Sequence, residues 1–100
     1  MTKLGDLPAI PVVYEELVVG AAAVGFASLP TVGQLVRSEA RVANGPINWR
    51  KDGTAPTASV GMPAFDGDTL LFDRNEASRF LAVRQGSTNG LIRAHHFVRA

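Results

Sequence analysis

The feature that most constrains the fold is a series of short apolar segments separated by strong turn signals. Segments rich in β-branched residues alternate with turns such as Asp52-Gly53 and Asp66-Gly67-Asp68, spaced roughly 8 to 12 residues apart. Asp-Gly favours a turn because glycine adopts positive φ freely and aspartate can hydrogen-bond its own backbone. This spacing predicts an all-β domain, an antiparallel β-sandwich (immunoglobulin-like) of seven or eight short strands.

The clearest strand is expected over residues 47–51, where apolar and polar residues alternate. Ile47 and Trp49 would lie on one face, and Asn48 and Arg50 on the other, as in a half-buried strand. Trp49 is therefore expected in the core, and the alternative is a surface position that stacks on a sugar ring. Further strands are expected over residues 12–19, 24–27, 34–42, 69–72, 80–85 and 91–98.

Two local signals refine this outline. Pro11 lies at the start of the first strand and predicts either an edge strand or a late start, because proline cannot donate to a sheet ladder. Residues 73–78 are expected to form a turn or one helical turn, capped by Asp73 or Asn75.

The length of 100 residues fits one domain, which we expect over residues 9–100 after an N-terminal arm of residues 1–8. The arm is expected either to be disordered or to dock on a neighbouring subunit. In the docking alternative the interface residues would be Leu4, Leu7, Pro8 and Ile10.

Composition argues against several classes of protein. The chain has no cysteine, which excludes disulfides and thiolate metal sites. Its net charge of +1 and a single adjacent basic pair, Arg50-Lys51, disfavour nucleic-acid binding, which needs a basic patch. The apolar stretch 17–29 is too short to span a bilayer and lacks the flanking charge of a signal peptide.

Catalytic and metal-binding patterns are not recognisable in the sequence. The adjacent His95 and His96 would point to opposite faces of a strand and could not bind one metal ion together. The acidic residues Asp66, Asp68, Asp73 and Glu76 do not match a calcium loop and suit turns and caps. No serine lies in a nucleophile motif. We therefore expect no enzyme and no catalytic, cofactor-binding or metal-binding residue; a deep pocket holding either histidine beside a serine would reopen the question.

The order of motifs resembles a known family. The stretch 47–61, which contains the Asp52-Gly53-Thr54 turn, is followed by Gly67-Asp68 with an apolar strand and by the Phe80-Leu81-Ala82-Val83-Arg84 strand. This order, over about residues 9 to 98, is similar to small β-sandwich virion structural proteins of tailed bacteriophages. It also resembles immunoglobulin-like accessory domains of some glycosidases.

The phage resemblance implies a capsid decoration or cement protein, or a head-tail accessory protein, that binds and stabilises the particle. Its partners would be the major capsid protein or other virion subunits, with neither nucleic acid nor membrane. It would be a homo-oligomer, a trimer, located in the virion and assembled in the cytoplasm of the host bacterium. No cofactor is implied. The alternative is a carbohydrate- or receptor-binding β-sandwich module on a phage tail, with Trp49 and Tyr14 as binding candidates.

Overall fold

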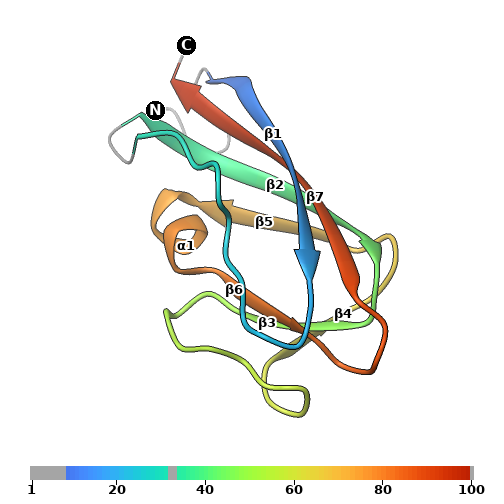
Figure 1. Cartoon of the computed structure of the whole chain (residues 1–100). Helices are drawn as coiled ribbons and strands as arrows, with labels where there is room; N and C mark the ends of the chain where they lie inside the picture. Colours follow the sequence, from blue (N-terminus) through green and yellow to red (C-terminus); the bar gives the residue numbers. More distant parts are fainter. Residues whose placement is uncertain (1–8, 32–33, 100) are drawn as a thin grey trace.

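The computed structural model describes residues 9–31 and 34–99, which form two antiparallel sheets facing each other (Figure 1). The expected all-β sandwich is confirmed. The expected arm, with Leu4, Leu7 and Pro8, lies outside the described residues.

The larger sheet has four strands and the smaller sheet has three. The larger has the order β1-β7-β2-β5, formed by β1 (Ala9–Val19), β7 (Gly90–Arg99), β2 (Leu35–Asn44) and β5 (Thr69–Asp73). The smaller has the order β4-β3-β6, formed by β4 (Met62–Ala64), β3 (Ile47–Arg50) and β6 (Leu81–Arg84). The strand order, which the sequence leaves open, places the last strand between the first two.

Strand β1 lies at an edge of the larger sheet, as Pro11 indicates. Its register against β7 is broken between Pro11 and Val13 and then runs without interruption to Val19. A bulge of this kind locally disrupts the ladder and twists the strand. The first strand is therefore confirmed, although it begins at Ala9 rather than at Val12.

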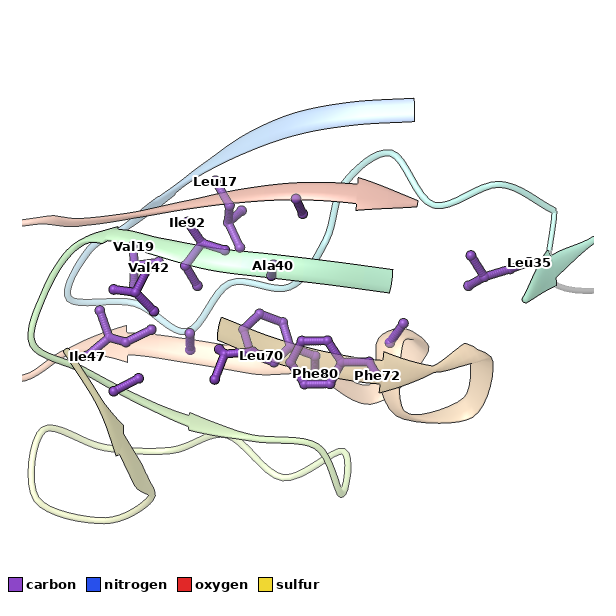
Figure 2. Close-up of a cluster of buried hydrophobic side chains, with 14 residues drawn as sticks. Leu17, Val19, Leu35, Ala40, Val42, Ile47, Leu70, Phe72, Phe80 and Ile92 are labelled. Carbon is purple, nitrogen blue, oxygen red and sulfur yellow. The ribbon is translucent and has the colours of Figure 1, made fainter. Parts of the chain in front are cut away.

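The core lies between the sheets, where alternate strand residues point inward (Figure 2). Ile47 is fully buried and Trp49, on the same face of β3, packs against this core. The inward placement of Ile47 and Trp49 is therefore confirmed, but the strand is not half-buried as expected, because Asn48 on the other face is only 5% exposed and donates hydrogen bonds to the loop carbonyls of Thr57 and Ala58. The buried apolar side chains that form the cluster are Leu17, Val19, Leu35, Ala40, Val42, Ile47, Ala64, Leu70, Phe72, Ala77, Phe80, Ala82, Ile92 and Ala94.

Residues 20–31, which we call the strap, lead from the end of β1 toward β2. They run along the side of the sandwich and pass β6 on the way (Figure 1, cyan). The strand expected over 24–27 is wrong, because the strap contributes only one isolated bridge, between Val24 and Ala82. The Phe26 ring reaches into the core and stacks on Phe80 with ring centroids 4.8 Å apart. The strap is thus held by side-chain packing, one isolated bridge and single hydrogen bonds rather than by a ladder.

The short helix α1 (Arg74–Arg79) begins at Asp73, the expected cap. Asp73 accepts a hydrogen bond from the Glu76 backbone N–H, and Glu76 accepts one from the Asp73 N–H, which completes a capping box. Strand β4 was not expected, since it is three residues long and contains Pro63. Within the described residues, no helix is long and apolar enough to cross a membrane.

Candidate functional site

The outward side of β1 carries an apolar stripe. Tyr14 and Val18, on either side of Glu16, are 51% and 58% exposed, and we call these two residues the β1 stripe. Large apolar side chains scattered singly on a surface need no explanation, but two on one face of an edge strand make that face a candidate binding surface. Ile10 is the one expected interface residue that the structure describes; it is 49% exposed, but it precedes the bulge, pairs with Val98 and lies on the opposite face from Tyr14.

Polar and aromatic residues of β7 adjoin the stripe. The Tyr14 and His95 ring centroids are 5.2 Å apart, and the Arg93 Nε lies 3.2 Å from a Glu16 carboxylate oxygen. The Tyr14 hydroxyl donates to that same Glu16 oxygen at 2.8 Å, and this hydrogen bond is the main cause that raises the pKa of Tyr14 above its ordinary value. The charge of Glu16 is therefore compensated within its own chain.

A second group of exposed apolar residues lies at β4 and its flanking turns. Val60, Met62 and Phe65 are all more than half exposed, and we call them the β4 patch. Val60 and Met62 line an open hollow of about 470 Å³ together with Trp49 and residues 50–52. The β4 patch therefore joins a hollow that is wide enough to receive a side chain or a small ring.

Trp49 forms one wall of this hollow and also packs inward. Its ring makes an edge contact with Phe72 at 5.7 Å between centroids and a tilted contact with Phe80 at 6.2 Å. Its indole Nε1 is buried without a hydrogen-bond partner among the described residues. Packing in the core is the main role of this ring, and only part of it is open to the hollow.

Charged residues around the hollow are tied to one another. The Arg50 guanidinium donates to the Asp52 carboxylate, and this contact is the main cause that lowers the pKa of Asp52 and raises that of Arg50. The Lys51 ammonium contacts Glu76 at the capping box, which lowers the pKa of Glu76. The rim of the hollow is thus a row of compensated charges.

A buried polar chain crosses the inner face of the larger sheet. The Ser38 Oγ lies 2.6 Å from His96 Nδ1, and His96 Nε2 lies 2.6 Å from Glu15 Oε1. Ser38 and His96 are fully buried, and Glu15 is 8% exposed. The Glu15 carboxylate also accepts hydrogen bonds from the backbone N–H groups of Ala27 and Ser28, so that this chain fastens the strap to β1.

The three side chains have the composition of a nucleophilic triad. A neutral His96 donates from Nε2 to Glu15 and accepts from the Ser38 hydroxyl at Nδ1, while a protonated ring donates from both nitrogens. However, Ser38 has no exposed surface, and the Phe26 ring covers His96 edge-on at 4.9 Å between centroids. In this conformation no substrate atom can reach the hydroxyl, and the chain serves to satisfy buried polar groups.

The structure separates several residues that the sequence suggested together. His96 points inward and His95 outward, as expected for neighbours in a strand. Tyr14 lies on the larger sheet and Trp49 on the smaller sheet, so that the two aromatic candidates do not share one site. Asp68 accepts a hydrogen bond from the Phe65 N–H, which confirms its expected turn-forming role, whereas Asp66 accepts one from the Gly45 N–H, 21 positions away.

Sequence reasoning missed both the contact between His96 and Ser38 and the burial of Glu15. The partners are 58 and 81 positions apart, and no local motif links them. No protein-family model, curated protein or solved structure matches this chain.

Proposed function

We propose that this protein is a structural subunit that docks on a larger particle, in the form that the resemblance implies: a decoration or cement protein of a tailed-phage virion. The observation that carries the proposal is the pair of exposed apolar surfaces, the β1 stripe and the β4 patch, on a small sandwich. Its partners would be the major capsid protein or other virion subunits.

Physical reasoning supports a docking role over a catalytic one. The Ser38 hydroxyl, the candidate nucleophile beside a histidine, is closed to solvent, whereas large apolar side chains are open to it. A subunit present in many copies on a lattice gains from multivalency, since weak single contacts add up. Binding to the folded state alone also stabilises the subunit by mass action.

The direct test is the protein content of particles purified from the strain that encodes the chain. Mass spectrometry should find the chain at a stoichiometric ratio to the major capsid protein. Its absence from such particles would rule the proposal out.

A second test addresses the surface. Purified chain is mixed with particles that lack it, and co-sedimentation is measured. Met62→Lys, in the β4 patch, should weaken binding, while Ser59→Lys, an exposed position in the same loop, should bind like the wild type. Equal binding by the two variants would remove the β4 patch from the interface.

A carbohydrate- or receptor-binding module is the second candidate function, and the hollow beside Trp49 favours it. Part of an aromatic ring faces an open hollow whose rim carries Arg50 and Asp52, and sugar sites combine such a stacking face with polar groups. Glycan-array binding that is lost in Met62→Lys and kept in Tyr14→Ala would support it. Absence of glycan binding by the wild-type chain would count against it.

A further inference from the structure

The sheet edges differ in how far they are protected. An open edge presents unpaired N–H and C=O groups that can pair with another chain. The edge of β6 is capped by the Val24–Ala82 bridge. Strand β4 is three residues long and contains Pro63, and β5 is five residues long. Strand β1, with eleven residues, is the longest edge strand in the described part of the chain.

Within β1, the open stretch is residues 13–19. These residues keep an unbroken register with β7 on one side. On the other side, they form no backbone hydrogen bond with the strap or with any other described element. The stretch ends at the bulge after Pro11 on one side and at Gly20 on the other. A partner strand could therefore add along seven residues.

We propose that the partner at this edge is the β1 strand of a second copy, paired antiparallel about a two-fold axis at Glu16. Glu16 is the middle residue of the stretch, so a two-fold axis at this position pairs every one of residues 13–19 with a residue of the same stretch in the second copy. It places Tyr14 opposite Val18 of the second copy, and Val13 opposite Val19. The two larger sheets then form one continuous sheet of eight strands.

The side chains suit this register. Tyr14 and Val18, both more than half exposed in the single chain, become an aromatic and β-branched cross-strand pair, a favourable combination. The pair occurs twice, once on each side of the axis. Tyr14 and Val18 are thereby each flanked by an apolar side chain of the second copy.

Charge at the axis is compensated. Glu16 lies opposite Glu16 of the second copy, and like charges directly opposite are unfavourable by themselves. In each copy, however, Glu16 forms an ion pair with Arg93 of the neighbouring strand β7, with 3.2 Å between the Arg93 Nε and a Glu16 carboxylate oxygen. The axis thus holds two carboxylates and two guanidinium groups, with no net charge.

Cysteine crosslinking tests the register directly, because the native chain contains no cysteine. In the proposed register, Cys at position 16 lies opposite its own copy, about 4.5 to 5.5 Å away between Cα atoms, within the range a disulfide accepts. Glu16→Cys should give a covalent dimer on mild oxidation. Single Tyr14→Cys and Val18→Cys variants should not, since each lies roughly 13 Å from its own copy.

A mixture of the Tyr14→Cys and Val18→Cys variants should crosslink as a heterodimer. The control is Ser59→Cys, in an exposed loop, whose crosslinking rate measures random collision between chains. Crosslinking at position 16 no faster than at position 59, or faster homodimer formation at position 14, would overturn the proposal. Light scattering gives a second readout without cysteine: wild-type chain should form a dimer, and Val18→Lys should weaken it roughly tenfold or more by placing charge in both pairs. A wild-type chain that remains monomeric at high concentration would also overturn it.

This inference deepens the proposed function by naming one partner of the β1 stripe, and it rests on that function only for its biological purpose. Failure to crosslink would remove the two-fold contact and leave virion incorporation to be tested by mass spectrometry. Absence from particles would remove the virion role and leave the crosslinking result standing.

Discussion

Glu15 and His96, 81 positions apart in the sequence, approach to 2.6 Å in the interior of the sandwich. Glu15 comes from the edge strand β1 and His96 from the adjacent strand β7. Through the same carboxylate the strap is fastened at Ala27 and Ser28. One buried side chain therefore ties three segments of the chain together.

Replacement of Glu15 should destabilise the fold far more than replacement of its neighbour. Glu15→Ala leaves His96 and two strap N–H groups without their acceptor in a buried place, so we expect a loss of about 3 to 5 kcal/mol in the free energy of unfolding. Glu16→Ala removes an exposed ion pair with Arg93 and should cost under about 1 kcal/mol. Urea unfolding followed by circular dichroism measures both; equal midpoints would contradict the buried role of Glu15.

The strap should be sensitive to a single methyl group at Gly25. A Cβ there would lie 2.7 Å from the Phe80 carbonyl oxygen, a backbone atom that cannot rotate away. Gly25→Ala should therefore destabilise by about 1 to 3 kcal/mol. Gly86 has nothing within 4 Å of an added Cβ, so Gly86→Ala, the control in thermal unfolding, should be close to neutral.

Gly53 should resist substitution for a different reason. Its φ of 85° lies in the region that favours glycine, while an added Cβ would meet no atom within 4 Å. Gly53→Val should cost about 1 to 2 kcal/mol through backbone strain alone, and Gly53→Asn less, because asparagine tolerates positive φ. A valine variant as stable as the asparagine variant in urea would show that this turn changes conformation.

Trp49 should prove to be a packing residue whose N–H is dispensable. Trp49→Ala removes contacts with Phe72 and Phe80 and should cost about 3 kcal/mol, the low end for such truncations because the ring is half-buried. Trp49→Phe keeps an aromatic ring and removes an Nε1 that has no partner, so its cost should be well below that of the alanine variant. Calorimetry on both variants checks the difference; a phenylalanine variant as unstable as the alanine variant would reveal a hidden partner for Nε1.

The capping box should make part of the stability depend on pH. The contact with Lys51 and the hydrogen bond from the Asp73 N–H lower the pKa of Glu76 in the folded state. A lowered carboxyl pKa stabilises the fold above the unfolded pKa, and this contribution is lost as pH falls through the folded pKa. In urea unfolding, Glu76→Gln should be less stable than wild type at pH 7, and the difference should shrink toward pH 3. A difference that stays constant with pH would contradict this.

Much of the local structure follows from short-range chemistry. The alternation of Ile47 and Trp49 predicts β3, because side chains in a strand point to opposite faces in turn. Asp73 predicts the start of α1, because an aspartate can accept a hydrogen bond from the free N–H groups of the first turn. The turns at Gly53 and Gly67 follow from the positive φ that glycine adopts without strain, and both residues have it.

Other features required the fold. Alternation along β1 assigns Glu15 to one face and Glu16 to the other, and both faces also carry apolar residues, so the pattern alone could not tell which glutamate is buried. That choice depends on His96, which reaches Glu15 only when β7 pairs with β1. The strap could not be predicted for the same reason, since its small residues have no period and its position depends on Phe80, Ala82 and Glu15.

The all-β class, most strand positions, the turns and the helix cap could therefore be predicted from local patterns, because each depends on residues within a few positions of one another. The strand order, the burial of Glu15 with His96 and Ser38, and the exposure of the β1 edge emerge only from the folded chain. These depend on contacts between residues far apart in the chain, whose energies no local pattern encodes.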